Sequence, residues 1–400
     1  METSALVAVL ATIVAWCVLA GRLQQLGLTA PIVFVAGGWM FADVLGLFEL
    51  EAEPELVKVI AEVTLVWVLF ADASRVRIGQ FRRDLNTYVR LLGVGLPLTI
   101  AIGTGAAMIV LGFDPWAALL VGAALAPTDA ALGAPVMSNP HVPAKVRSAL
   151  NVESGLNDGI ATPIVLVAIA GVATDEGVLG VESPGGAVVS LLVGLLAGII
   201  VGGVGGVITR RARARRWLSE ELGGPAVLAL ALLAYTAALF TDGNGFVAAF
   251  VGGLVFGNVA GRTGEKEVYF VDQSSDMAAM ISWLIFGALA IPVIQDSWSW
   301  TMLGYALLSL TVVRMLPVVL ALLGAGLDRH SVVFVGWFGP RGLASVIFAL
   351  IALEDLHVAG EDVVAVISLT VLLSVMAHGF SAVPAANRFA AKGPPADEPG

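Results

Sequence analysis

The sequence has little charge and almost no cysteine, and each shortage excludes a class of protein. Charged residues make up 13% of the 400 residues, whereas soluble domains carry about 25%, so a soluble enzyme is excluded. The 21 Lys and Arg against 31 Asp and Glu give a net charge of −10, which leaves no net basic character for binding nucleic acid. Cys17 is the only cysteine, so neither an intrachain disulfide nor a cysteine-based metal site can form.

Apolar residues are what the chain has in excess. They make up 58% of the sequence, and the mean hydropathy is +0.92. Runs of about 17–25 apolar residues are the length of a membrane-spanning helix. The pattern therefore predicts an all-α polytopic membrane protein with about 13 transmembrane helices. The expected spans are 4–21, 28–47, 56–74, 86–112, 115–136, 145–172, 186–209, 219–241, 245–260, 269–294, 299–325, 331–352 and 361–386.

The basic residues predict how these spans are oriented. If the N-terminus is outside and the spans alternate, 18 of the 21 Lys and Arg fall on inner loops and ends, as the positive-inside rule requires. No positive charge precedes the first apolar run, which favours an uncleaved first helix over a signal peptide. We therefore expect a multi-pass plasma-membrane protein with its N-terminus outside and its C-terminus in the cytoplasm.

The spans also predict an internal repeat. Pro127-Thr128-Asp129 in the fifth span and Gly339-Pro340-Arg341 in the twelfth are helix-breaking segments, separated by seven spans and about 211–217 residues. Because seven is odd, the two halves must have inverted topology, as in many secondary transporters. We expect a single transmembrane domain over 1–400. Its parts would be a first repeat at 1–172, a linking helix and basic loop at 186–217, a second repeat at 218–390 and a cytoplasmic tail at 391–400.

Six charged residues lie within or near the ends of the apolar spans. An ionised side chain at the bilayer centre costs about 2.5–3.5 kcal/mol even on the lenient insertion scale, so these residues must face the protein interior and find partners there. We expect Glu153 to pair with Arg341, unless Arg341 binds only carbonyls of the broken helix, and Arg314 to pair with Asp276. His378 is expected to be a satisfied core histidine. The six are Asp72, Asp129, Glu153, Asp158, Arg314 and Arg341.

The helical spacing in the sixth span predicts a cation site. Ser154 and Asp158 are four residues apart and share one face, where their oxygens form the kind of site that hard cations prefer. Thr128 and Asp129 lie at the predicted interruption, whose half-helix ends point at the centre. Asp72 could add a carboxylate, or it could be a solvated helix end. Because one oxygen cluster can hold Na⁺ or H⁺ but not both, such a site predicts exchange.

At these residues the chain resembles the monovalent cation:proton antiporters of the NhaP type, the electroneutral branch. The resemblance implies an NhaA/NhaP-like fold, a homodimer and no cofactor. It implies that Asp158 binds the cation or the proton, with Ser154, Thr128 and Asp72 contributing to a Na⁺ site. It further implies that Asp129 and Asn157 hold the crossing of the broken helices, and that Glu153 and Arg341 form a salt bridge. The matching stretches are Phe70-Ala-Asp72, Pro127-Thr-Asp129, Glu153-Ser-Gly-Leu-Asn-Asp158, Gly243-Asn-Gly-Phe246 and Gly339-Pro-Arg-Gly342.

The function expected from the sequence is Na⁺ (or Li⁺)/H⁺ exchange by alternating access. Asn157 in place of a second aspartate leaves one titrating carboxylate in the pair, which favours one-for-one exchange. A K⁺/H⁺ antiporter on the same scaffold is the main alternative, and an organic-ion symporter, a channel or an intramembrane protease are weaker ones. The expected partners are monovalent cations, protons, membrane lipid and a second copy, and no enzymatic activity is expected.

Overall fold

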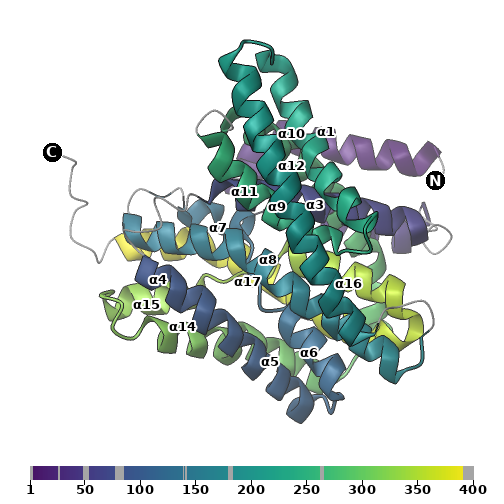
Figure 1. Cartoon of the computed structure of the whole chain (residues 1–400). Helices are drawn as coiled ribbons and strands as arrows, with labels where there is room; N and C mark the ends of the chain where they lie inside the picture. The colour runs from purple at the N-terminus through teal and green to yellow at the C-terminus, as the bar shows by residue number, and fades with distance from the viewer. Residues whose placement is uncertain are drawn as a thin grey trace.

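The structure is a computed structural model of the chain, and every long regular element that it describes is a helix (Figure 1). It describes residues 3–25, 28–47, 54–76, 85–137, 139, 142–178, 183–261 and 265–390. The expected short tail, 391–400, and most of the basic loop after the third span lie outside these residues. The all-α prediction is therefore confirmed for the described part of the chain.

The described residues of the first half form nine α-helices and two π-helical turns. Three of the expected spans, 28–47, 86–112 and 115–136, are built from more than one piece, because a π-turn or a break interrupts them. The elements are α1 (Thr3–Gln25), α2 (Ala30–Trp39) with the turn η1 (Met40–Val44), α3 (Pro54–Arg75), α4 (Leu85–Arg90), η3 (Leu91–Gly95), α5 (Leu96–Val110), α6 (Pro115–Ala124), α7 (Ala130–Met137), α8 (Ala144–Asp175) and α9 (Pro184–Ala214).

The second half repeats this pattern of long and interrupted helices. Its elements are α10 (Glu220–Leu239), α11 (Gly245–Ala260), α12 (Glu265–Asp296), α13 (Trp300–Leu308), η5 (Ser309–Val313), α14 (Arg314–Leu322), α15 (Arg329–Trp337), α16 (Leu343–Leu356), η6 (His357–Gly360) and α17 (Glu361–Ala390). Each half has one π-turn in the span before its broken span, and the two breaks lie seven spans apart as the sequence predicts.

Eight described helices are long and apolar enough to cross a bilayer, and shorter apolar helices lie at Ala30–Val44, Pro115–Ala124 and Gly245–Ala260. The helical segments coincide with the thirteen expected runs, but the count of thirteen crossings stays a prediction. Burial distinguishes the centre from the rim: 72% of the most apolar window of α8 and of α17 is buried, against 22% for α1. The two central helices therefore position the polar residues described below.

The helices pack in two groups. One group contains α4 to α8 and α13 to α17, and α4 and α5 run beside α14 and α15 along the lower edge of Figure 1. The other contains α1 to α3 and α9 to α12, with α11 packed between α9 and α3. α3 contacts both α8 and α16, so it lies where the two groups meet.

Glycine allows the tightest of these contacts. Gly202 of α9 faces Gly252 of α11, and a Cβ added at Gly202 would lie 2.2 Å from the Gly252 carbonyl oxygen. No side chain fits in that space, so the two helix backbones approach as closely as glycine permits. Such contacts stabilise helix pairs in membranes, where lipid removes most of the hydrophobic drive for association.

Candidate ion-binding site

Two broken helices cross at the centre of the molecule. α6 ends at Ala124 and α7 begins at Ala130, while α15 ends at Trp337 and α16 begins at Leu343. Each gap contains a proline, which lacks the N–H that a continuous helix would need. The backbone N–H of Asp129 donates a hydrogen bond to the carbonyl oxygen of Pro340 at 2.8 Å, so the two gaps touch.

Asp129 caps both half-helices at this crossing. Its carboxylate accepts a hydrogen bond from the N–H of Leu343 at 2.9 Å and one from the N–H of Leu132 at 3.3 Å. A negative charge at a helix N-terminus satisfies N–H groups that have no partner within the helix, and it is favoured by the helix dipole. These contacts fit the role of holding the crossing, and a direct place for Asp129 in the ion site stays a prediction.

Arg341 provides the opposite charge at the crossing. Its side chain is fully buried, and its guanidinium donates to the carbonyl oxygen of Ala126 at 3.0 Å and to that of Ser309 at 3.4 Å. Its backbone N–H donates to the hydroxyl of Ser374 at 2.7 Å. The carbonyl end of α6 therefore faces a cation, and the residue that supplies it comes from the other broken helix.

The predicted salt bridge between Glu153 and Arg341 is wrong. Glu153 instead forms a two-pronged pair with Arg314, with Nη1–Oε1 and Nη2–Oε2 distances of 2.5 and 3.0 Å. Arg314 directly follows the π-turn of the eleventh span, and its guanidinium reaches Glu153 on α8. Arg341 binds backbone carbonyls, which is the alternative that the sequence left open.

The predicted pairing of Arg314 with Asp276 is also wrong, because Arg314 pairs with Glu153. Arg314 is buried with Glu153, whereas Asp276 is exposed on α12 and accepts a hydrogen bond from Gln273 at 3.3 Å. Similar depth in the membrane was the only basis for that pairing, and depth does not determine which faces of two helices meet.

Four of the predicted site residues come together between the first break and α8. The hydroxyls of Thr128 and Ser154 are 3.0 Å apart, and the amide nitrogen of Asn157 donates to the Thr128 hydroxyl at 2.7 Å. Asp158 lies one turn beyond Ser154 on α8 and is 8% exposed. The structure thus brings Thr128, Ser154 and Asn157 into contact and places Asp158 beside them.

Two oxygens of this cluster are buried without a hydrogen bond. Oδ1 of Asp158 and Oδ1 of Asn157 accept none from the residues that the structure describes. A buried polar oxygen without a partner costs free energy, so these two oxygens are candidate ligands for a proton or a cation. Carboxylate, amide and hydroxyl oxygens are the ligands that hard monovalent and divalent cations take.

Asp72 lies close to this cluster but has a different partner. Its backbone carbonyl is 3.9 Å from where a Cβ on Gly155 would lie, which places α3 against α8 at the level of Ser154. Its carboxylate lies 3.6 Å from the guanidinium of Arg75, and Arg75 also contacts Asp272 of α12. Direct ligation of the ion by Asp72 therefore stays a prediction.

Sequence reasoning missed how α17 holds the second break. His378 is buried, with Nε2 at 2.9 Å from the carbonyl of Trp337 and Nδ1 at 2.9 Å from that of Ser374. Ser374 in turn binds the backbone of Arg341, so one turn of α17 contacts both sides of the gap. Ser374 and His378, two polar residues four apart in an apolar run, were the sequence signal for this contact. The prediction that His378 is a satisfied core histidine is confirmed.

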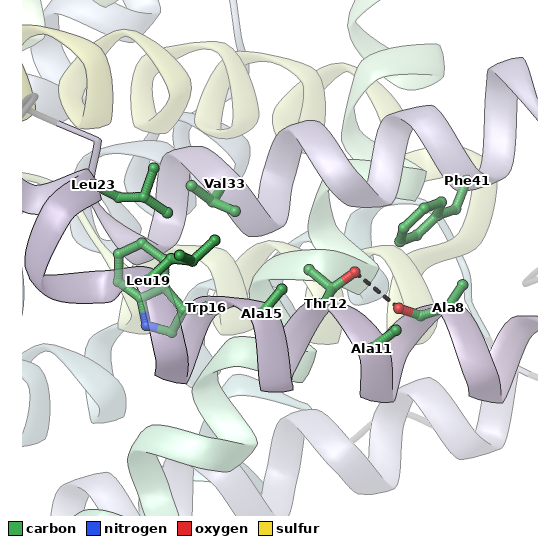
Figure 2. Close-up of a pocket in the computed structure, with 9 residues that line it drawn as sticks. All are labelled: Ala8, Ala11, Thr12, Ala15, Trp16, Leu19, Leu23, Val33 and Phe41. Carbon is green, nitrogen blue, oxygen red and sulfur yellow. Dashed lines mark hydrogen bonds between the residues drawn. The ribbon is translucent and has the colours of Figure 1, made fainter.

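The groove between α1 and α2 has a different character. It has a volume of about 490 Å³ and is apolar, and the hydroxyl of Thr12 within it is already bonded to the carbonyl of Ala8 (Figure 2). No acidic side chain lines it, so we do not assign ion binding to it. It is lined by Ala8, Ala11, Thr12, Ala15, Trp16, Leu19, Leu23, Val33 and Phe41.

Comparison with known proteins finds relatives of this chain among curated antiporters. The chain is 27% identical to the K(+)/H(+) antiporter NhaP of Alkalimonas amylolytica, over 74% of this chain and 51% of the relative. It is 25% identical to the K(+)/H(+) antiporter NhaP2 of Shewanella sp. (strain ANA-3), over 93% of this chain and 64% of the relative. The chain thus spans about half to two thirds of the length of these curated relatives.

The fold matches a solved structure over almost its whole length. The sodium proton antiporter MjNhaP1 of Methanocaldococcus jannaschii superposes with a TM-score of 0.82, at 21% identity, covering 97% of this chain and 98% of that chain. The family model described as "Sodium/hydrogen exchanger, transmembrane" matches residues 6–388. The chain therefore belongs to the transmembrane sodium/hydrogen exchanger family.

Proposed function

We propose that the protein exchanges Na⁺ (or Li⁺) for H⁺ across the membrane, one for one, at a site centred on Asp158. The observation that carries the proposal is the buried carboxylate oxygen of Asp158, which accepts no hydrogen bond from the described residues and lies beside the hydroxyls of Ser154 and Thr128. Asn157 holds Thr128 in place through its amide nitrogen. The transported ions are the only small molecules that the mechanism requires.

Coupling follows from the cost of an uncompensated buried charge. A bare carboxylate at mid-membrane costs about 2.5–3.5 kcal/mol on the lenient scale, which disfavours its movement across the membrane by roughly 60- to 400-fold. Binding either H⁺ or a monovalent cation neutralises Asp158. Only the two loaded forms then pass readily between the two faces, so the protein exchanges one ion for the other.

Alternating access would be a movement of one helix group against the other. The broken helices lie in the group of α4 to α8 and α13 to α17, and α3, α11 and α12 of the other group cover this centre. Because Asp129 and Arg341 tie the two breaks to each other, we expect the crossing to move with the ion as one unit.

The assembly and orientation are part of the same proposal. We propose a homodimer in the plasma membrane, in contact with lipid, with the N-terminus outside and the C-terminus in the cytoplasm. We also propose that 1–172 and 218–390 are inverted repeats joined by 186–217. The positions of the breaks and of the π-turns η3 and η5 support the repeat, since in each half one of these turns lies in the span before the broken span.

K⁺/H⁺ exchange is the second candidate, and a specific observation favours it. Both curated relatives above are named K(+)/H(+) antiporters, whereas the structural neighbour is named a sodium proton antiporter. Cation choice depends on the size and number of oxygens in the site, and both names fit the same ligands. An organic-anion symporter is disfavoured, because the described charged neighbours of Asp158 are the acids Asp72 and Asp129.

The test uses the purified full chain in liposomes with an acid interior and a trapped pH dye. Adding Na⁺ or Li⁺ is expected to raise the internal pH at a rate that a valinomycin voltage clamp leaves unchanged. A response to K⁺ alone would select the second candidate. Asp158→Asn is expected to abolish the response in protein that elutes as a single species, and surviving exchange in that variant would overturn the assignment.

A further inference from the structure

Arg75 holds a positive charge beside the ion site. It lies at the end of α3, with Nη1 at 3.6 Å from Oδ1 of Asp72, and its other terminal nitrogen contacts Asp272 of α12. The guanidinium therefore bridges two carboxylates on two helices. Its side chain is 46% exposed, so the protein does not enclose it.

Asp72 connects this bridge to the site. Its backbone lies against Gly155, between Ser154 and Asp158 in the sequence of α8. Its charge acts on Asp158, as does that of Asp129, and Asp129 is occupied with the two helix ends. Asp72 is thus the remaining described carboxylate that could turn toward an ion at Asp158, and Arg75 is the cation that now holds it.

We propose that Arg75 is a tethered cation that competes with the transported ion for Asp72, and that it thereby sets the apparent affinity of exchange. The inference rests on the proposed function and names a residue that tunes it. When an ion occupies Asp158, the Asp72 carboxylate turns toward that ion and leaves Arg75. When the ion leaves, Arg75 takes the carboxylate back.

The geometry of the pair suits such a competition. A separation of 3.6 Å is too long for a hydrogen bond, and the pair is only partly buried, with side chains 46% and 22% exposed, so solvent weakens it. The pair of Glu153 and Arg314 shows the opposite design, with two short contacts and both side chains 4% exposed. An incoming ion can therefore displace Arg75 from Asp72, whereas the buried pair stays fixed.

Asp272 lowers the free-energy cost of separating Arg75 from Asp72. It keeps Arg75 anchored to α12 while Asp72 is engaged elsewhere, so the guanidinium is never left without a carboxylate. Without that anchor, Arg75 would have Asp72 as its only described partner. The three residues are therefore expected to act together, and each can be tested through the other two.

The test compares Arg75→Gln with wild type in the liposome assay, at one pH and with varied cation concentration. We expect the apparent KM for the cation to fall about two- to fivefold, the ratio that corresponds to losing one exposed ion pair, while the maximal rate changes less. Arg75→Lys keeps the charge and should stay near wild type. Arg22→Gln removes an exposed arginine from the end of α1, distant in the chain from the site, and serves as the matched control.

The double variant Arg75→Gln/Asp72→Asn decides whether Asp72 is the contested group. The gain in cation affinity that Arg75→Gln produces should be absent from the double variant. An unchanged or higher KM in Arg75→Gln, or a gain that persists without Asp72, would overturn the proposal. Asp272→Asn provides a second measurement, independent of whether Arg75→Gln folds. In this variant Arg75 loses Asp272 and can bind Asp72 more tightly, which should raise the apparent KM for the cation. A lower or unchanged KM would count against the competition.

Failure of this inference is distinct from failure of the proposed function. Wild type and Asp158→Asn are measured in the same series. If wild type exchanges ions and Asp158→Asn does not, the proposed function stands whatever Arg75→Gln does. If wild type is silent with Na⁺, Li⁺ and K⁺, the proposed function fails first.

Discussion

The buried pair between Glu153 and Arg314 offers the sharpest test of the fold. Replacing Glu153 with Gln leaves the Arg314 guanidinium charged and buried, with its two short contacts to a carboxylate lost. Removing one partner of a buried ion pair costs about 3–5 kcal/mol.

The measurement is the melting midpoint of purified protein in detergent, followed by tryptophan fluorescence. A loss of 3–5 kcal/mol corresponds to a decrease of roughly 3–10 °C in a protein of this size. Glu220→Gln is the matched control, because Glu220 pairs with Lys266 at 3.6 Å with both side chains at least 76% exposed, and its midpoint should not move.

Double variants test which arginine is the partner. Glu153→Gln/Arg314→Gln removes both charges together, so it should melt at a higher temperature than either single variant. If Glu153→Gln/Arg341→Gln gives that recovery instead, the pairing read from the structure is refuted and the one predicted from sequence is right. A wild-type midpoint in Glu153→Gln would show that the pair is not formed at all.

Two further predictions concern the scaffold. Gly202→Val places a side chain against the backbone of α11 and should sharply reduce the yield of single-species protein in size-exclusion chromatography, while Gly21→Val, where a Cβ meets nothing within 4 Å, should not. Asp328 caps α15, and hydrogen bonds from the Ser331 hydroxyl and from backbone N–H groups hold the pKa of its carboxyl below the ordinary value. Asp328→Ala should therefore cost about 1 kcal/mol at neutral pH, and the difference from wild type, measured by melting midpoint, should vanish as the pH falls through that lowered pKa.

The sequence predicted most of the architecture, because the bilayer restricts the choices. A run of twenty apolar residues has one regular structure that satisfies its backbone in lipid, so helix positions follow from composition alone. Pro127 and Pro340 indicated the breaks, since proline removes a donor from the helix at a fixed place. Spacing along α8 indicated that Ser154 faces the first break, and its hydroxyl does contact that of Thr128 there.

What the sequence could not predict is which helix faces which. The partner of Glu153 depends on the rotation of α14, and the π-turn at Ser309–Val313 changes that rotation by inserting a residue into the helical repeat. Nothing in the local composition of Ser-Leu-Thr-Val-Val marks such a turn. The arrangement around Asp72 was missed for a related reason, because Asp272 comes from a helix two hundred residues away.

The six charged residues in the apolar spans differ in how completely the protein provides partners for their charges. Glu153 and Arg314 neutralise each other, and Asp129 and Arg341 neutralise the ends of the broken helices, so these four maintain the scaffold. Asp72 has a loose and solvent-exposed partner. Asp158 has no described cation near it, and its oxygen Oδ1 accepts no hydrogen bond from the described residues. Under the proposed function, the open carboxylate of Asp158 is the place that an external positive charge fills. Because a proton and a monovalent cation carry the same charge, we propose that either one completes the site, and that this shared requirement couples the movement of the ion to that of the proton.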